Sequence, residues 1–339
     1  MKKTIIYYTL LVFSMSLISC FPDIDNEMME APYQERFESP YSIYGNSTFY
    51  KIHENITELV VNHKIGGWDL AFQSALEGDF VLLNYTTSAE AIKTGTQDFS
   101  AIDKNTVNQL FNSDDWKFND PSFSNAKDSL ALKDWESKEV YLINRGGAFP
   151  AEESYYKIQF VSKTASSYTF KYAHIESSDG IETTIDRSSV YVNQYFSFET
   201  GENSNFEPQI NNWDFFFTPY MGWYETNEPG VYSPYYLTGV MINNEGGVRV
   251  SEIDDENIAY EDITLTDAQA LTYTDFKGVI GSRWKKIPDT ENPIYNMDTA
   301  KKYIIKLSDG NYYKLRFLDF YNSESGEQGY TSFEILLLE

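Results

Sequence analysis

Cysteine and histidine are scarce in this chain. The 339 residues contain one Cys, Cys20, and three His, His53, His63 and His174. A single Cys cannot form an internal disulfide, so folding must rely on a buried core, which a chain of this length can supply. No His has a partner at a metal-site spacing such as HxxxH, so we expect each to be hydrogen-bonded or solvated.

The sequence motifs of common enzyme classes are also missing. After Cys20 there is no Cys nucleophile, and we find no G-x-S-x-G, no P-loop and no G-x-G-x-x-G after a predicted strand. Carboxylates are numerous, but nothing selects one pair for glycosidase-like chemistry. The acidic run at 254–257 lacks the spacing of a calcium-binding loop. The sequence therefore predicts a protein that is not an enzyme.

Positive charge is in short supply, and aromatic residues are abundant. Lys and Arg number 26 against 51 Asp and Glu, a formal net charge of −25. Such a charge repels nucleic acid and anionic lipid head groups, so we exclude both as partners. Aromatic residues make up 17% of the chain, with 27 Tyr and 23 Phe, which favours an all-β fold.

The first 41 residues are predicted to be an export signal followed by a tether. Lys2 and Lys3 precede an apolar stretch that is short for a membrane span, and residues 17–20 (LISC) resemble a bacterial lipobox. We expect residues 1–19 to be a lipoprotein signal peptide and Cys20 to carry the lipid; an ordinary signal peptide or membrane anchor is the alternative. Residues 20–41 are acidic, without periodicity, and predict a flexible tether typical of surface export.

The rest of the chain shows signs of an internal duplication. GGWDLAF at 66–72 corresponds to NNWDFFF at 211–217, and YYKIQF at 155–160 to YYKLRF at 312–317. Tyr50 and Tyr195 each lie 18 residues before the Trp of their copy, and GTQDFSAI at 95–102 parallels GGVRVSEI at 246–253. Because the order is kept across four stretches, we predict two β-rich units, 42–178 and 188–339.

Turn and cap chemistry predicts the local elements. Residues 303–307 and 312–317 are strand-like runs joined by Ser-Asp-Gly-Asn, a sequence that favours a tight hairpin turn. Short helices are expected at 104–111, capped by Asp103, and at 268–271, capped by Thr266 or Asp267.

The two Trp-Asp pairs are predicted to be structural. Each Trp should fill the core of its sheet while the Asp side chain fixes a turn or strand end. The alternative is that Asp69 and Asp214 line a site.

Together these stretches resemble the HmuY-like lipoproteins of Bacteroidetes. The resemblance rests on YFSF from 195, NNWDF from 211, GGVRV from 246 and the final hairpin, and it is fainter over the first unit. It implies an all-β outer-membrane surface lipoprotein that takes haem from host carriers and passes it to a TonB-dependent transporter. In that family two axial side chains, His or Met, come from the segment before the final hairpin.

The sequence departs from this pattern where the ligands are expected. Residues 254–302 contain no His, and after Trp284 the only soft ligand is Met297, with Tyr295 nearby. Asp289 stands near the place of a family ligand. Met297, Tyr295 and, further upstream, Met221 are therefore the haem-binding candidates.

The segment 219–239 is predicted to be an aromatic loop. It holds Tyr220, Trp223, Tyr224, Tyr232, Tyr235 and Tyr236 among Gly and Pro residues. An exposed loop of this kind could grip a porphyrin, stack on a sugar or anchor a protein, whereas a structural loop would fold back over the sheet. Two functions remain: a haem-binding surface lipoprotein, or a duplicated surface module that binds a protein or glycan and no longer binds haem.

Overall fold

The structure is a computed structural model that describes residues 36–53, 56–74, 80–121, 130–134, 136–226, 228–287 and 294–339. The predicted signal peptide, Cys20, most of the tether and Asp289 lie outside the described residues. No helix in the described part of the chain is long and apolar enough to cross a membrane.

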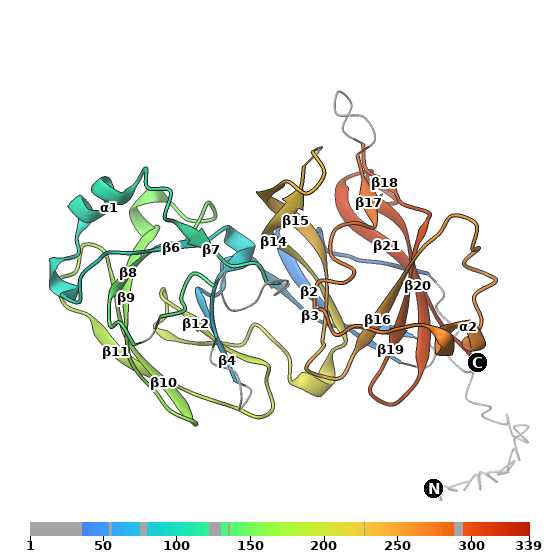
Figure 1. Cartoon of the computed structure of the whole chain (residues 1–339), viewed down its shortest axis with the longest axis horizontal. Helices are drawn as coiled ribbons and strands as arrows, with labels where there is room; N and C mark the ends of the chain where they lie inside the picture. The colour runs from blue at the N-terminus through green and yellow to red at the C-terminus, as the bar shows by residue number, and fades with distance from the viewer. Residues whose placement is uncertain are drawn as a thin grey trace, which may run out of the picture. The chain divides into compact units, whose positions relative to one another are not determined.

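The fold is all-β, as predicted, with 46% of the described residues in strands and 9% in helices. A five-stranded sheet has the order β1 (Arg36–Glu38), β21 (Gln328–Leu337), β20 (Tyr312–Tyr321), β19 (Lys301–Lys306) and β16 (Arg249–Asp254). A six-stranded sheet has the order β11 (Ile181–Asp186), β10 (Ser167–His174), β9 (Tyr155–Lys163), β8 (Val140–Asn144), β6 (Glu90–Lys93) and β7 (Lys117–Phe118). We call these the outer sheets (Figure 1).

Two four-stranded sheets, the inner sheets, complete the fold. One has the order β15 (Tyr232–Ile242), β14 (Phe215–Glu225), β2 (Asn46–Ile52) and β3 (Thr57–Lys64). The other has the order β13 (Glu202–Ser204), β12 (Asn193–Ser197), β4 (Leu70–Gln73) and β5 (Val81–Leu83). The short strands β17 (Lys285–Lys286) and β18 (Asn296–Met297) form a separate two-stranded sheet. All pairings between these strands are antiparallel.

Each inner sheet combines strands from both predicted units. β2, from the N-terminal part, pairs with β14, the strand that follows the second Trp-Asp, and Figure 1 shows the two side by side. In the same way β12 pairs with β4, the strand that follows the first Trp-Asp. The hairpin that precedes each Trp-Asp thus pairs with the Trp-Asp strand of the other half of the chain. The boundaries 42–178 and 188–339 stay a prediction.

The inner sheets contain segments buried on both faces, which explains the uninterrupted apolar runs at 70–72, 81–83 and 215–217. In β14, Phe215 and Phe217 join the core facing the five-stranded sheet, whereas Phe216 joins a central core between the two inner sheets. In β4, Leu70 and Phe72 face the six-stranded sheet, and Ala71 faces the central core. A strand buried on both faces needs no polar alternation.

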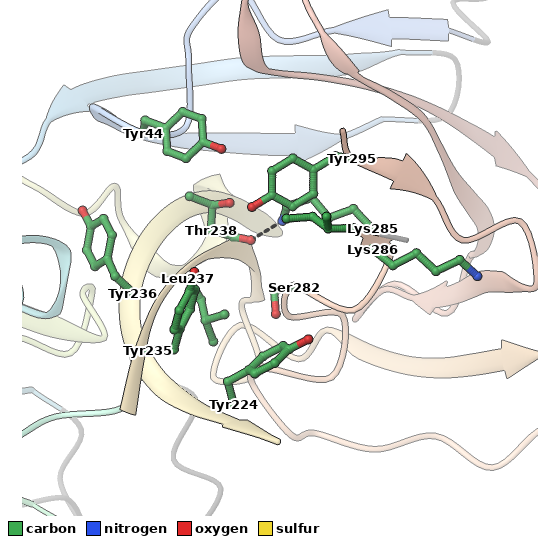
Figure 2. Close-up of a pocket in the computed structure, with 11 residues that line it drawn as sticks. Tyr44, Tyr224, Tyr235, Tyr236, Leu237, Thr238, Ser282, Lys285, Lys286 and Tyr295 are labelled. Atoms are coloured by element: carbon green, nitrogen blue, oxygen red, sulfur yellow. Dashed lines mark hydrogen bonds between the residues drawn. The ribbon is translucent and has the colours of Figure 1, made fainter. Parts of the chain in front are cut away.

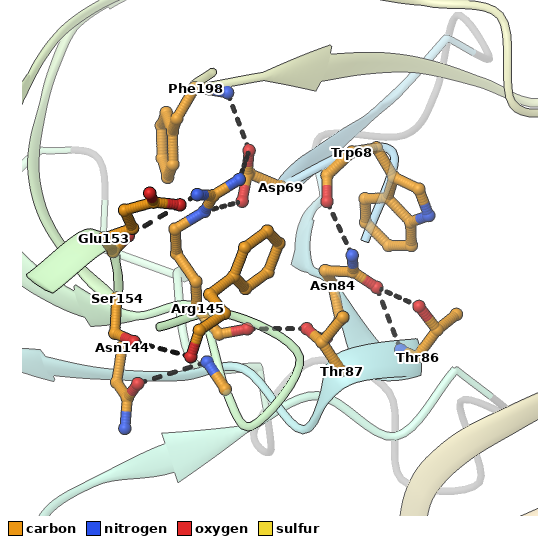
Figure 3. Close-up of polar contacts among 12 residues, drawn as sticks. Trp68, Asp69, Asn84, Thr86, Thr87, Asn144, Arg145, Glu153, Ser154 and Phe198 are labelled. Carbon is orange, nitrogen blue, oxygen red and sulfur yellow. Dashed lines mark hydrogen bonds and ion pairs between the residues drawn. The ribbon is translucent and has the colours of Figure 1, made fainter. Parts of the chain in front are cut away.

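The two Trp-Asp pairs are structural, as predicted. Trp68 and Trp213 are buried in the central core, where Trp68 contacts Tyr195 edge-on with ring centroids 4.9 Å apart. Asp69 accepts two hydrogen bonds from Arg145, at 2.6 and 3.1 Å, and one from the Phe198 amide at 2.7 Å (Figure 3).

The second Asp has the corresponding arrangement in the other inner sheet. Asp214 accepts from the Ile52 amide at 2.7 Å and from Lys51 Nζ at 2.8 Å. Each carboxylate therefore fastens the hairpin that comes from the other half of the chain.

The expected hairpin at the C-terminal end is present. β19 and β20 pair around the turn at 307–311, in which Gly310 has φ of +95°. Tyr313, Leu315 and Phe317 point into the core on one face, as predicted, although Lys314 on the other face is buried too.

Three local expectations need correction. The second helix, α2 (Leu265–Ala270), is capped by Thr264, with Asp267 bonding back to the Thr264 amide, whereas Asp103 caps α1 (Lys104–Leu110) as expected. The equivalent of Tyr50 is Phe196 rather than Tyr195. Tyr50 pairs with Phe215, the residue after Asp214, and Phe196 pairs with Leu70, the residue after Asp69. The third correction concerns the parallel between 95–102 and 246–253. Residues 246–253 include most of β16, whereas residues 95–102 form a bend and a 3-10 turn (Phe99–Ala101). The strand that pairs with β8 is β6.

Candidate functional site

A cavity of about 380 Å³ opens beside the β14–β15 hairpin. Its walls combine three distant parts of the chain: the segment before β2, the outer half of the hairpin, and residues 282–287 together with Tyr295 (Figure 2). The cavity is lined mainly by five tyrosines and two lysines, Tyr44, Tyr224, Tyr235, Tyr236, Tyr295, Lys285 and Lys286. We call it the tyrosine cavity. Lys286 pairs with Asp298 at 3.3 Å, whereas Lys285 is buried.

A close backbone contact fixes one wall of this cavity. Residues Val240 and Gly281 exchange two backbone hydrogen bonds, at 2.9 and 3.0 Å. A Cβ added to Gly239 would lie 2.5 Å from the Gly281 carbonyl oxygen, so the approach requires glycine at 239. This contact holds the turn at 282–284 against β15 and sets where the next residues project.

Trp284 anchors the residue that enters the cavity. Its ring stacks on Phe317 with centroids 4.1 Å apart, and its Nε1 donates to the Gly281 carbonyl at 3.0 Å. The neighbouring Lys285 is 8% exposed, and its Nζ donates to the Thr238 carbonyl, as Figure 2 shows. The same Nζ lies 4.3 Å from the Trp284 ring centroid and 4.9 Å from that of Phe320. Lys285 is therefore a buried amine in an aromatic surround.

Burial controls the ionisation of these groups. It lowers the pKa of Lys285 to about 7, because the ammonium loses water without gaining a carboxylate. Burial also raises the pKa of Tyr295, against the opposing effect of a hydrogen bond with Tyr44. The pKa of Tyr236 rises to about 12 for the same reason, burial. At neutral pH Tyr236 and Tyr295 are therefore protonated, while Lys285 titrates.

The three haem-ligand candidates do not converge. Tyr295 lines the tyrosine cavity, but neither Met297 nor Met221 lines it. Met297 pairs with Lys285 in the β17–β18 ladder and packs against the core of the five-stranded sheet. Met221 pairs with Tyr236 across the β14–β15 ladder. Of the three candidates only Tyr295 therefore lines this cavity, and the choice of a haem ligand stays a prediction.

The predicted aromatic loop is a long β-hairpin. β14 and β15 pair continuously from Phe215–Ile242 to Glu225–Tyr232, leaving only residues 226–231 as the turn. Tyr220 is buried in the central core, so it is not part of an exposed surface. Trp223, Tyr224, Tyr232 and Tyr235 are exposed, and the Tyr236 hydroxyl donates to the Thr86 carbonyl at 2.6 Å.

A larger groove of about 650 Å³ lies on the other side of Tyr224, Leu237 and Ser282, which line both hollows. Trp223, Tyr224 and Tyr232 contribute aromatic rings to it, and Asp120, Glu225 and Arg283 contribute charged groups. We call it the tryptophan groove.

Sequence reasoning missed Lys285 and Tyr44. Lys285 could have been suspected from its place directly after Trp284, in the segment that the resemblance linked to ligand binding. Tyr44 carries no sequence signal, because only the tertiary fold brings the segment before β2 to this cavity. Asp69 and Asp214 line neither hollow, in agreement with their structural role.

Comparison with known proteins supports the resemblance seen in the sequence. Residues 191–335 match the family model described as HmuY protein, a span that contains β12 to β20 and most of β21. This part of the chain, which holds most of the tyrosine cavity, is HmuY-like. No curated protein matches the chain.

Three solved structures of bacterial proteins are similar to the chain. A protein of Bacteroides vulgatus, provisionally named HmuY-like and heme-binding, is 16% identical, with 89% of this chain and 90% of that chain covered and a TM-score of 0.21. A provisionally named lipoprotein of Bacteroides fragilis is 12% identical, with 89% and 86% covered and a TM-score of 0.20. The apo HmuY analog of Tannerella forsythia is 11% identical, with 91% and 100% covered and a TM-score of 0.20.

Proposed function

We propose that the chain is a ligand-capturing surface lipoprotein, without enzymatic activity, whose tyrosine cavity takes a flat anionic ring ligand, with haem as the first candidate. The observation that best supports this proposal is the buried amine of Lys285 among tyrosine rings. Ser282, Lys285 and Tyr295 belong to the segment from which the resemblance draws the family ligands, so the cavity lies where such a ligand is expected.

The residues fit the ring and the carboxylates of haem but not a pair of axial ligands. Tyrosine faces suit a planar aromatic ring, and an ammonium in an apolar surround suits a carboxylate. Among the described residues no His or Met lines the cavity, and the raised pKa of Tyr295 opposes its binding to iron as a phenolate. The volume of about 380 Å³ is at the lower end for ligand sites, so part of a porphyrin would stay exposed.

The proposed setting follows from the resemblance. Cys20 would carry the lipid and hold the chain in the outer membrane, facing the cell surface. Haem would come free or from a haem-carrier protein and would pass to a TonB-dependent outer-membrane transporter. An exposed ligand edge would suit such a transfer, since the receiving protein needs access to the ligand.

The second candidate is a surface module that binds a protein or glycan and no longer binds haem. It is favoured by the exposed aromatic side chains at the end of the β14–β15 hairpin. Two of these, Trp223 and Tyr232, lie outside the tyrosine cavity. Exposed clusters of this kind mark interaction surfaces.

A haem titration of the mature, unlipidated chain tests the first candidate. Saturable binding with a shifted Soret band is expected, and Lys285→Met should weaken it about tenfold because the ligand carboxylate loses its cation. Tyr295→Phe should change the band if the hydroxyl contacts the iron. Met297→Ala is the matched control and should leave the band unchanged. No saturable band at tens of micromolar protein would reject haem as the ligand and leave the second candidate.

A further inference from the structure

The tryptophan groove presents aromatic faces that the fold itself does not use. Trp223, Tyr224 and Tyr232 are 47%, 53% and 55% exposed, although aromatic rings are normally buried. All three line the same groove, at the outer end of one hairpin. Their exposure therefore creates one apolar surface within a concavity.

The groove is held in shape before any ligand arrives. Trp223 packs on Phe118 of β7, with ring centroids 5.4 Å apart, so a strand of the six-stranded sheet supports its ring. The hairpin turn is closed by the Glu225 carboxylate, which accepts from the Gly230 amide at 2.8 Å, and Gly230 has φ of +79°. A preorganised aromatic surface loses little conformational entropy on binding.

The polar groups around these rings include both donors and acceptors. Asp120 and Glu225 supply carboxylates, Arg283 a guanidinium, and Thr226 and Ser282 hydroxyls. Planar carboxylates and guanidinium groups can each bond two neighbouring hydroxyls of a ligand. Opposite charges are mixed along the walls, so the groove is suited to a ligand that carries many hydroxyls and no net charge.

We propose that the tryptophan groove is a binding site for a neutral oligosaccharide, with pyranose rings stacked on Trp223 and Tyr232. A sugar ring has an apolar C–H face and a rim of hydroxyls, which matches aromatic faces bordered by donors and acceptors. An acidic glycan is disfavoured by two carboxylates in the groove and by the net charge of −25. A protein partner is disfavoured by the small concave surface, since stable protein interfaces bury about 800 Å² on each side. This inference is independent of haem binding in the tyrosine cavity.

Affinity electrophoresis tests the proposal directly. The mature, unlipidated chain is run in native gels that contain a soluble neutral glucan, mannan, galactan or xylan, and any retarding polysaccharide is followed by calorimetry with its tetra- to hexasaccharides. We expect retardation by at least one of them. Trp223→Ala and Tyr232→Ala should each raise the Kd at least tenfold.

Two controls separate this site from other effects. Tyr41→Ala removes a ring of similar exposure (40%) outside both hollows and should leave the Kd unchanged. Tyr295 lines only the tyrosine cavity, so Tyr295→Phe should also leave the Kd for the oligosaccharide unchanged, whatever its effect on haem binding. Glu225→Gln provides a milder variant if either alanine variant fails to fold.

The proposal is overturned if none of the four polysaccharides retards the folded chain, or if retardation survives both Trp223→Ala and Tyr232→Ala. Binding of a defined protein that Trp223→Ala abolishes, without any retardation by polysaccharide, would reassign the groove as a protein-docking surface. In either case a haem titration that still saturates would show that the function proposed for the tyrosine cavity stands.

Discussion

Replacing Arg145 with Met should be among the most destabilising single changes in this protein. Asp69 and Arg145 are each 2% exposed at the side chain, and they share two hydrogen bonds of 2.6 and 3.1 Å. The Phe198 amide supplies only one further hydrogen bond to the carboxylate. A buried carboxylate that loses its partner costs about 3–5 kcal/mol, so the free energy of unfolding should fall by that amount.

Lys51→Met is the matched comparison, because Lys51 has the corresponding place beside Asp214. The Lys51 side chain is 26% exposed and makes a single contact of 2.8 Å, so water can replace much of the interaction. We expect a loss of about 1 kcal/mol, typical of partly exposed ion pairs. Arg145→Lys, which keeps the charge but not the paired hydrogen bonds, should fall between the two.

The effect of Arg145→Met should also depend on pH. Burial raises the pKa of Asp69, and in the wild type the Arg145 hydrogen bonds oppose that rise. Without Arg145 the folded-state pKa lies higher still, so the folded variant keeps a proton that the unfolded chain loses above about pH 4. Its stability deficit relative to the wild type should therefore grow as the pH rises above the wild-type folded-state pKa of Asp69, and level off above that of the variant.

Guanidinium unfolding followed by tryptophan fluorescence measures both effects, since Trp68 and Trp213 are buried next to the two Asp residues. Unfolding free energies at pH 5 and pH 8 give the magnitude and the sign of the pH dependence. An Arg145→Met variant that loses no more stability than Lys51→Met, or whose deficit shrinks with rising pH, would refute this account of the ion pair.

Three further predictions follow from the same structure. The fragment 188–339 lacks β2 and β3, so it should give no sharp thermal transition by circular dichroism; a cooperative melt would show that the exchanged hairpin is dispensable. Gly239→Ala should lower the unfolding free energy by about 2 kcal/mol, because its Cβ would lie 2.5 Å from the Gly281 oxygen; Gly147→Ala, which meets nothing within 4 Å, should stay within about 0.5 kcal/mol of wild type, and equal losses would contradict the contact. The wild type should gain stability relative to Lys285→Met as the pH rises from 7 towards 10, since the folded-state pKa of about 7 lies below the unfolded value; parallel denaturation midpoints would argue against a buried neutral amine.

Local sequence signals predicted the features that depend on neighbouring residues. The Asp103 cap, the tight turn at Gly310 and the burial of both Trp residues each follow from a few adjacent side chains. The choice of partner strand does not, because a buried strand such as β14 can pair with any other apolar strand. The pairing of β2 with β14 is therefore visible only in the structure.

The tyrosine cavity and the hairpin beside it could not be predicted for related reasons. The cavity joins Tyr44 to residues 180 or more positions away, such as Tyr224, which no local pattern indicates. Residues 219–239 looked like a loop because they contain Pro219, Pro234 and several Gly. Pro234 is tolerated because β15 is an edge strand, and Pro219 because β2 pairs with β14 only at Phe215–Phe217.

The exchanged hairpins also bear on when this protein can fold. The hydrogen bond between Ile52 and Asp214 joins residues 162 positions apart, and that between Asp69 and Phe198 joins residues 129 apart. Pairing over such separations is slow, because a long loop must close before any contact is gained. The inner sheet that contains β12 and β4 cannot be completed before residue 204 has been made, and the one that contains β14 and β2 cannot be completed before residue 242. The strands of the N-terminal half therefore cannot complete their sheets until most of the protein has been synthesised. Such a delay is compatible with export of an unfolded chain before it folds.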